Sequence, residues 1–408
     1  MTNNRRRSSS PANQERTPFT QEMITGVFLQ LPVKSLKRFK SLSKSCYSII
    51  NSQDFINAHL KNSANQLLVR RFHYPTGSYF SLSLMDYSDT EPAIFREIPI
   101  PFLHSLERYP RIVGSVNGLL CLDISPIHGS EFILWNISTE QYVILPRPEF
   151  KIDDFKNPIW MAATGFGYNQ ESDDYKLVRI VLFDCDHKPI RAEVYSWRTN
   201  SWRILDFDEK IVDFSISEGE TAVHLNDGCL YWLANGIGDS VDRKYIISFD
   251  LGSETFNRIN IPENSGAFCA KVLEFRNSLA LVFYPAAYVH PGYGSSANEI
   301  ELWVDSDYGD ADDTNRYKQW VRVFRVTMDL SSAEMGCPIC VHNDDEEVVV
   351  FHRVSADSVN LAFLNPDKET IKTVPICHSD YTCHFYSYVA SLVPVAVYGV
   401  QAEADHEQ

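Results

Sequence analysis

The sequence predicts a mainly β chain, with an N-terminal three-helix unit followed by a β-propeller of about six blades. Three observations support this fold class. Apolar residues near the N-terminus recur at three-residue steps, which is the pattern of a short helix. After residue 62 the apolar period changes to two, which is the pattern of a strand. A coarse repeat then continues to about residue 393, and 12% of the chain is aromatic, which favours strands.

The helical pattern occupies residues 31–60. Leu36, Phe39 and Leu42 follow at three-residue steps and form one apolar stripe. Two further short segments carry Ile49, Ile50, Phe55, Ile56 and Leu60. Five basic residues are interspersed: Lys34, Lys37, Arg38, Lys40 and Lys44. A unit this small cannot bury all these apolar side chains by itself, so we expect it to bind a partner. The alternative is a helical cap that covers the end of the following domain.

The repeat is clearest in its middle strand. Its aligned positions are Leu84, Trp135, Tyr195, Phe249, Trp303 and Phe363, at intervals of 51, 60, 54, 54 and 60 residues. A unit of about 50 residues has the size of a four-stranded blade, and radial stacking of blades hides the sheet edges. We expect the last apolar run, residues 385–392, to close the ring. A large β-sandwich is the competing architecture.

The charge divides the chain in two. Residues 1–62 carry ten Lys and Arg and three Asp and Glu, a charge of +7. The whole chain carries −16, which leaves −23 on residues 63–408. Such a field disfavours nucleic-acid binding there and favours a basic protein partner, although the acidity can equally serve solubility alone.

Composition also bears on compartment and boundaries. No run of 18 apolar residues predicts a membrane span, and residues 1–18 predict a disordered basic tail in which Arg5, Arg6 and Arg7 are an alternative nuclear signal. Nine scattered cysteines favour reduced thiols, and so a cytoplasmic protein that can also be nuclear. We expect the helical module at residues 19–61, the propeller at 63–393 and a C-terminal tail at 394–408.

Motifs for chemistry are weak. Cys337 and Cys340 form a CxxC pair, followed at a distance by Cys377, His378, Cys383 and His384. This spacing does not suit a second zinc-binding pair, so we expect thiols and no metal. Residues 305–310 indicate a solvated acidic turn, and residues 165–168, Gly-Phe-Gly-Tyr, a tight strand entry with aromatic packing. No catalytic constellation is found, so we expect a non-catalytic binding protein without a cofactor.

The run Leu31-Pro32-Val33-Lys34-Ser35-Leu36 with Arg38-Phe39-Lys40, followed by Ile49-Ile50 and Asp54-Phe55, resembles the F-box of plant proteins over residues 19–61. The chain departs from the usual pattern at Phe19-Thr20 and at Cys46. The resemblance implies docking on a Skp-type adaptor and, through it, a cullin. The implied apolar contacts are Leu31, Pro32, Val33, Leu36 and Phe39. The implied basic contacts are Lys34, Lys37 and Arg38, which would meet an acidic adaptor surface.

Residues 110–325 resemble the F-box-associated, kelch-like domain, through motifs such as Asn117-Gly118-Leu119-Leu120-Cys121 and Asp174-Tyr175-Lys176-Leu177-Val178-Arg179. The pattern is similar to the S-locus F-box and S-locus-F-box-like family. The resemblance implies a substrate-recognition subunit of a ubiquitin ligase, with recognition of basic pistil ribonucleases as one possibility. The alternatives are a non-degradative scaffold and a ligand-binding propeller. We expect target choice in loops of one face, at residues 184–188, 237–243, 288–297 and 305–317.

Overall fold

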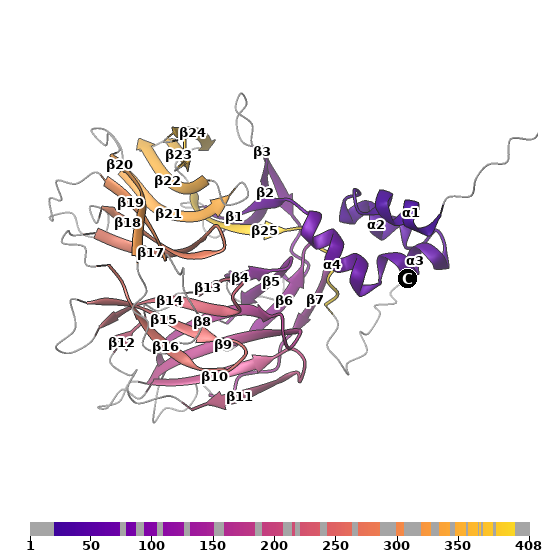
Figure 1. Ribbon diagram of the computed structural model, residues 1–408, viewed down its shortest axis with the longest axis horizontal. Helices are drawn as coiled ribbons and strands as arrows, with labels where there is room; N and C mark the ends of the chain where they lie inside the picture. The colour runs from indigo at the N-terminus through magenta and orange to yellow at the C-terminus, as the bar shows by residue number, and fades with distance from the viewer. Residues whose placement is uncertain are drawn as a thin grey trace, which may run out of the picture. The chain divides into compact units, whose positions relative to one another are not determined.

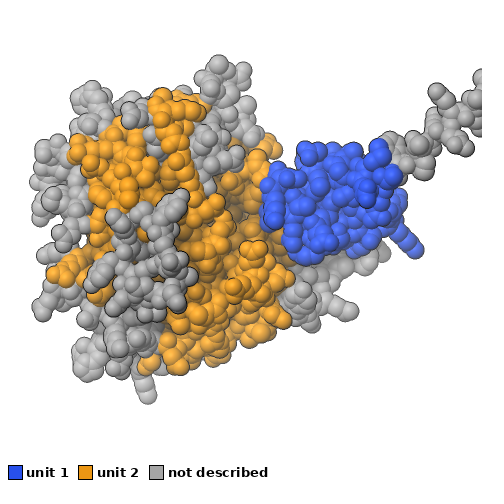
Figure 2. All heavy atoms as spheres, viewed as in Figure 1, with its two compact units in different colours: residues 1–62 blue, residues 63–408 orange. Residues whose placement is uncertain are grey.

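The computed structural model divides the chain into two compact units, residues 1–62 and 63–408 (Figure 2). The structure describes residues 20–73, 79–86, 94–103, 109–125, 131–150, 159–183, 190–206, 214–216, 221–236, 243–262, 268–285, 299–305, 320–327, 334–342, 347–355, 358–365, 367–368, 370–377 and 381–395. Each unit has its own secondary structure, helical in the first and β in the second (Figure 1).

The first unit contains four short helices among its described residues, so the expectation of three was wrong. They are α1 (Gln21–Phe28), α2 (Val33–Phe39), α3 (Lys44–Ile50) and α4 (Gln53–Asn62). The missed helix is α1, which lies before the apolar stripe used for the prediction. Leu42 was expected on that stripe, but α2 ends at Phe39 and the Leu42 side chain is 67% exposed. None of the described helices is long and apolar enough to cross a membrane.

Local capping explains where these helices begin. The hydroxyl of Thr20 accepts a hydrogen bond from the Met23 amide at 3.3 Å, and that of Ser43 accepts one from the Cys46 amide at 3.1 Å. Pro32 precedes α2, and its fixed φ suits a helix start. Thr20 and Cys46, two of the positions at which the sequence departs from the usual F-box pattern, therefore take part in one helix cap each.

The second unit contains 25 strands among its described residues, arranged in six antiparallel sheets. The first sheet is β25 (Tyr381–Val389), β1 (Asn65–His73), β2 (Tyr79–Asp86) and β3 (Ile94–Ile98). The second is β4 (Arg111–Val116), β5 (Leu119–Asp123), β6 (Phe132–Asn136) and β7 (Gln141–Ile144). The third is β8 (Ile159–Asn169), β9 (Asp174–Phe183), β10 (Ile190–Ser196) and β11 (Ser201–Leu205).

The other three sheets follow the same plan. The fourth is β12 (Phe214–Ser215) and β13 (Val223–His224) against β14 (Cys229–Gly236), then β15 (Lys244–Asp250) and β16 (Phe256–Asn260). The fifth is β17 (Phe268–Phe275), β18 (Ser278–Pro285), β19 (Glu299–Asp305) and β20 (Trp320–Thr327). The sixth is β21 (Glu334–His342), β22 (Glu347–Ser355), β23 (Ser358–Asn365) and β24 (Thr370–Cys377).

The sheets form a closed ring. Their first strands contact one another in the order β25, β4, β8, β13, β17 and β21, and β21 contacts β25 again. This arrangement is a β-propeller, so the expected mainly β chain with a propeller is confirmed, and two packed sheets of a sandwich are not what the chain forms. The expected closure is confirmed as well, because β25 pairs with β1 along its whole length, from Asn65 opposite Val389 to His73 opposite Tyr381.

The sequence repeat corresponds to one strand of each sheet. Its six aligned positions, Leu84, Trp135, Tyr195, Phe249, Trp303 and Phe363, lie in β2, β6, β10, β15, β19 and β23. Each of these is the third strand of its sheet, counted from the centre of the ring. The third strand is covered by a neighbouring strand on either side, which explains its strong apolar signal: Trp135, Tyr195, Phe249 and Phe363 are at most 1% exposed.

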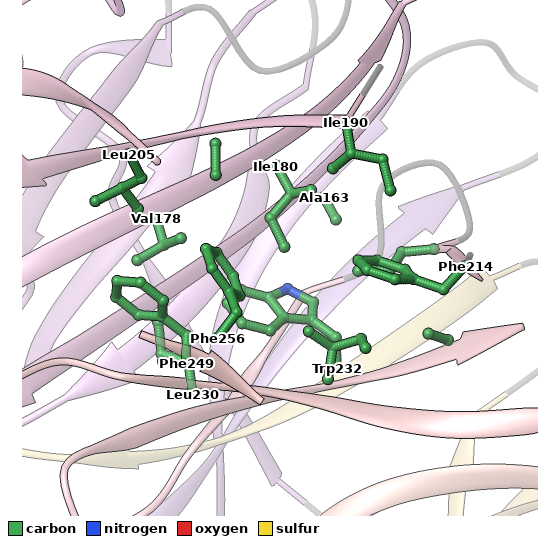
Figure 3. Packing of buried hydrophobic residues seen from close by; sticks show 14 of the residues in the cluster. Ala163, Val178, Ile180, Ile190, Leu205, Phe214, Leu230, Trp232, Phe249 and Phe256 are labelled. Atoms are coloured by element: carbon green, nitrogen blue, oxygen red, sulfur yellow. The ribbon is translucent and has the colours of Figure 1, made fainter. Parts of the chain in front are cut away.

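Neighbouring sheets pack through large side chains and glycines. Figure 3 shows Trp232 and Phe249 of the fourth sheet beside Val178 and Ile180 of the third. Gly165 lies in the interior of β8, not at a strand entry as expected, since a Cβ there would come within 2.6 Å of Trp232. The missing side chain lets the Trp232 indole donate a hydrogen bond to the Thr164 carbonyl at 3.0 Å. The expected aromatic packing is present, with the Phe166 and Tyr175 rings stacked 5.9 Å apart.

A buried ion pair fixes the passage from the second sheet to the third. Arg179 and Glu193, both fully buried, pair between β9 and β10. Glu193 also accepts hydrogen bonds from the amides of Glu149 and Phe150, at 2.9 and 3.2 Å. Arg179 donates to the Phe150 carbonyl at 3.1 Å. The pair therefore anchors the chain that leads into the third sheet.

The segment after β25 ties the first sheet to the second. The Asn136 amide donates to the carbonyls of Ser391 and Val393, at 3.2 and 2.8 Å. Val395 is buried in the core of the second and third sheets, so packed chain extends past residue 393. Asn117 and Gly118 both have positive φ in the turn between β4 and β5, and Gly118 lies against Ser391.

Candidate partner-binding surfaces

The helical unit has a small core of its own. Its buried apolar side chains are Phe28, Val33, Leu36, Ile49, Ile50, Phe55 and Ile56. The rings of Phe28 and Phe39 lie 5.6 Å apart, which joins α1 to α2. The imidazole of His59 is 2.9 Å from the carbonyl of Leu31, which joins α4 to the turn before α2. These contacts hold four short helices together, although isolated helices of this length are unstable in water.

Two of the expected adaptor contacts belong to that core. Leu36 has no exposed surface and Val33 is 4% exposed, so neither side chain is available to a partner in this conformation. The expectation that they form direct contacts is therefore corrected: they fix the position of α2. Of the other expected contacts, Pro32, Lys34 and Arg38 are exposed, while Leu31, Lys37 and Phe39 are half-buried. Their contact with an adaptor remains a prediction.

A different set of apolar side chains faces solvent. Met23, Val27, Leu42 and Tyr47 are 55%, 58%, 67% and 57% exposed. Met23 and Val27 are four residues apart and therefore lie on one side of α1, opposite in character to the buried Phe28. Among these four, sequence reasoning singled out only Leu42, and for the wrong role. A second apolar row on α1, beside the row that includes Phe28, is the signal that could have identified Met23 and Val27.

Basic side chains accompany these apolar ones. Lys34, Arg38 and Lys44 are exposed, and only two carboxylates, Glu22 and Asp54, occur in residues 20–62. Burial, together with the charge of Lys37, lowers the pKa of Lys40. We use the name helical face for the set of exposed large apolar and basic side chains of this unit, Met23, Val27, Leu42, Tyr47, Lys34, Arg38 and Lys44. It presents apolar surface with a positive charge, which suits an acidic protein partner.

The propeller surrounds a central channel. The cavity has a volume of about 1320 Å³ and is lined by residues of β25, β4, β8, β13 and β17, the first strands of five sheets. The two ends of the channel differ in chemistry. The turns that follow the first strands contribute Asn117, Glu171, Asp227 and Asn277, which are amides and carboxylates.

Cations line the channel nearer the start of these strands. Arg111 begins β4, Lys271 lies in β17, and Arg70 lies in β1 opposite His384 of β25. We define the basic cluster as Arg70, Arg111, Lys271 and His384. Burial, with the charges of Arg70 and Lys271, lowers the pKa of His384 to about 4. The cluster was not found from the sequence, where its members are up to 314 positions apart.

The expected target-binding loops, residues 184–188, 237–243, 288–297 and 305–317, lie outside the described residues except Arg243 and Asp305. The strands that flank them show which end of the sheets each joins. The first three segments join a second strand to a third, whereas residues 305–317 join the third strand β19 to the fourth strand β20. In antiparallel sheets these connections lie at opposite ends, so the four segments cannot share one face as expected.

The remaining cysteine and histidine candidates do not assemble into a site among the described side chains. No group of three or more His, Cys, Asp or Glu in the described part of the chain could hold a metal ion. Cys337 and Cys340 lie in β21, and their side chains are outside the described residues. Cys46, Cys121, Cys229 and Cys269 form no disulfide bond, and burial raises the pKa of Cys121.

Comparison with known proteins now identifies the family. The family model for the F-box associated beta propeller domain matches residues 86–395. The chain belongs to the F-box-associated β-propeller family. The Arabidopsis thaliana F-box protein CPR1 is 25% identical over 393 residues, covering 91% of this chain and 88% of that protein. F-box protein At4g22390 from the same plant is 24% identical, covering 91% and 89%.

Other known proteins are also similar to the chain. The F-box/kelch-repeat protein At3g23880 of Arabidopsis thaliana is 24% identical and covers 71% of this chain and 76% of its own length. Among solved structures, a fucose-specific lectin from Aleuria aurantia matches with a TM-score of 0.39 and 9% identity, covering 78% of this chain and 96% of the lectin. The expectation of a plant F-box protein with an F-box-associated propeller is thus confirmed.

Proposed function

We propose that this F-box protein is the substrate-recognition subunit of a Skp–cullin–F-box ubiquitin ligase. The observation that carries the proposal is the helical face, an exposed apolar and basic surface on a small helical unit joined to a closed propeller. In this proposal the helical face binds a Skp-type adaptor, and through it a cullin. The propeller holds the target so that its lysines come within reach of a ubiquitin-charged enzyme.

The chain itself supplies no catalytic group in this proposal, since the assembly accelerates transfer by proximity. The charge of −23 on residues 63–408 supports a target with a basic surface, because opposite charges speed encounter. A secreted basic ribonuclease would have this property, and so would many other proteins. The free thiols support a reducing compartment, so we place this function in the cytoplasm or nucleus.

We also propose that each of the six sheets is one blade of a six-bladed propeller. The support is the succession of contacts between first strands, which passes through every sheet once and returns to β25. A regular ring of this kind gives a rigid body on which target-binding loops can vary.

Copurification of the full chain with a plant Skp-type adaptor tests the main proposal. Val27→Asp and Leu42→Asp place a charge on the helical face without entering the core, unlike a substitution at Leu36. We expect both variants to lose adaptor capture, because a carboxylate would have to be desolvated at the interface. The matched control is Ile204→Asp, at a side chain that is 51% exposed on the outer strand β11.

The control should retain adaptor capture at the wild-type level. If the folded wild-type chain captures no adaptor, or if Val27→Asp and Leu42→Asp both capture it as well as Ile204→Asp does, the proposed docking surface is wrong.

A further inference from the structure

Three fixed cations meet in the central channel of the propeller. Arg70, Arg111 and Lys271 line the same cavity, although they come from β1, β4 and β17. Arg70 and Arg111 are close enough that the charge of Arg111 lowers the pKa of Arg70. The positive charges of Arg70 and Lys271 both lower the pKa of His384. His384 is therefore within electrostatic reach of two of the cations, and it lies directly opposite Arg70 in the pairing of β25 with β1.

These cations are only partly neutralised. Arg111 pairs with Asp123, at 2.5 Å between its guanidinium and the carboxylate. Arg70 donates to the neutral Pro110 carbonyl at 3.0 Å and hydrogen-bonds the Tyr386 hydroxyl. In the described part of the chain, no hydrogen bond or ion pair is formed by the half-buried ammonium of Lys271. The cluster therefore keeps the positive charge of the Lys271 ammonium, while His384 is neutral at pH 7.

The position of this charge is unusual for the domain. Residues 63–408 carry a net charge of −23. The cations in the channel are therefore not part of a domain that is basic throughout. The carboxylates that line the same cavity are Glu171, Asp227, Asp250 and Glu274. Glu171 lies after β8, Asp227 after β13 and Asp250 at the end of β15, whereas Glu274 is three residues beyond Lys271 in β17. Like charges held together in a partly desolvated site cost free energy, which a bound anion would offset.

The chemistry of the cluster favours a phosphate group over a single carboxylate. Two guanidinium groups can each form paired hydrogen bonds with phosphate oxygens, and an ammonium adds a point charge. A phosphate near pH 7 carries up to two negative charges, so it gains more from several cations than a carboxylate with a single charge does. The cavity of about 1320 Å³ has room for a phosphorylated small molecule or a short peptide segment, but not for a folded protein.

We propose that the basic cluster of the channel, Arg70, Arg111, Lys271 and His384, is a binding site for the phosphate group of a ligand that enters the propeller. This site does not depend on adaptor binding, so it stands or falls separately from the ligase proposal. Lys271 is the best residue to test, because its ammonium group forms no hydrogen bond or ion pair with the residues that the structure describes.

The test is calorimetric titration of the full chain with pyrophosphate. We expect binding by the wild type, and about tenfold weaker binding by Lys271→Met, which loses one charge-assisted hydrogen bond but keeps an apolar stem of similar size. Lys271→Arg should restore binding. The matched control is Lys244→Met, which removes the same charge from a half-buried side chain of β15 that does not line the channel.

Absence of pyrophosphate binding by the wild type, or equal binding by Lys271→Met and Lys244→Met, would overturn the site. Succinate bound as tightly as pyrophosphate would overturn the assignment to phosphate. A phosphoserine peptide that binds more tightly than both pyrophosphate and its unphosphorylated form would support the site and identify the source as a peptide. Tighter binding of pyrophosphate would support it and identify the source as a small molecule.

The pKa of His384 tests whether the anion binds in the basic cluster itself. If phosphate sits in the cluster, its charge should raise the pKa of His384 above its value of about 4, measured from the imidazole NMR shifts with and without pyrophosphate. An unchanged pKa at saturating pyrophosphate would mean that the anion binds elsewhere, and the proposal would fail.

Discussion

The helical unit and the propeller treat apolar surface in opposite ways. Residues 20–62 leave four large apolar side chains exposed, at Met23, Val27, Leu42 and Tyr47. The propeller, which is several times larger, exposes five among its described residues, and all five lie on fourth strands of their sheets: Tyr142, Ile144, Ile204, Val321 and Val323. The propeller buries most of its apolar surface by closing a ring. The helical unit leaves part of its apolar surface exposed, which is typical of a surface that binds another molecule.

The largest effect on stability should come from breaking the buried ion pair of the propeller. Arg179→Met leaves the Glu193 carboxylate buried without its cation, so the free energy of unfolding of the propeller should fall by about 3–5 kcal/mol. Urea unfolding followed by tryptophan fluorescence measures this directly, since all seven tryptophans lie in residues 63–408. The double variant Arg179→Met/Glu193→Met should recover most of the loss. Equal stability of the single variant and the wild type would show that the pair contributes little.

Closure of the ring can be weakened at one glycine. Gly118 has a φ of 76°, and a Cβ there would come within 2.6 Å of the Val389 carbonyl. Gly118→Ala should therefore lower the free energy of unfolding by about 2 kcal/mol, through strain and the contact with the segment after β25. Gly228→Ala is the matched control, because φ is 78° but the nearest neighbouring atom is 3.8 Å away. If both variants lose the same stability, the contact with the final segment is not what matters.

In the helical unit, a glycine-to-alanine substitution should increase stability instead of lowering it. Gly26 lies inside α1, and a Cβ there would meet no atom within 4 Å. Gly26→Ala should stabilise α1 by about 0.5–1 kcal/mol, because alanine loses less backbone entropy in a helix. Hydrogen exchange of the α1 amides in the full chain measures this, while the fluorescence-detected unfolding of the propeller should stay unchanged. Slower exchange throughout both units would mean that they do not unfold separately.

The smallest effect should be a pH dependence in the propeller. The pKa of His384 is about 4 in the folded chain, below the 6.5 expected when unfolded, so the unfolded state takes up the proton first as the pH falls. His384 should therefore cost stability progressively between about pH 6.5 and pH 4. Solvent in the channel weakens this effect. Comparing urea midpoints at pH 7 and pH 5 for wild type and His384→Gln checks it, and an identical pH dependence would contradict it.

Sequence reasoning found those parts of the fold in which a buried strand can be recognised from its own run of apolar residues. Trp135, Phe249 and Phe363 mark third strands because these strands are covered on both sides and read as apolar runs. The helices were harder, since a short stripe does not say where a helix ends. Leu36 and Leu42 have the same spacing from Phe39, yet one is fully buried and the other is 67% exposed beyond the end of α2.

The channel could not be found from the sequence for a different reason. Arg70, Arg111, Lys271 and His384 become neighbours only when the last strand pairs with β1. His384 was noticed only as a distant companion of the CxxC pair, and no local pattern marks Arg70, Arg111 and Lys271, because each belongs to a different strand. The segments expected to bind a target were assigned to one face without regard to strand order, which decides the end of the sheet that each segment joins.

The pairing of β25 with β1 has a consequence for synthesis of the chain. Because β25 begins at Tyr381, the ribosome must synthesise β2 to β24 before β1 acquires its second neighbour. Until then β1 presents an unpaired strand edge, which is a site where chains aggregate or recruit chaperones. A nascent chain that stalls or terminates before residue 381 cannot close its ring, so truncation before β25 should affect the solubility of the whole protein.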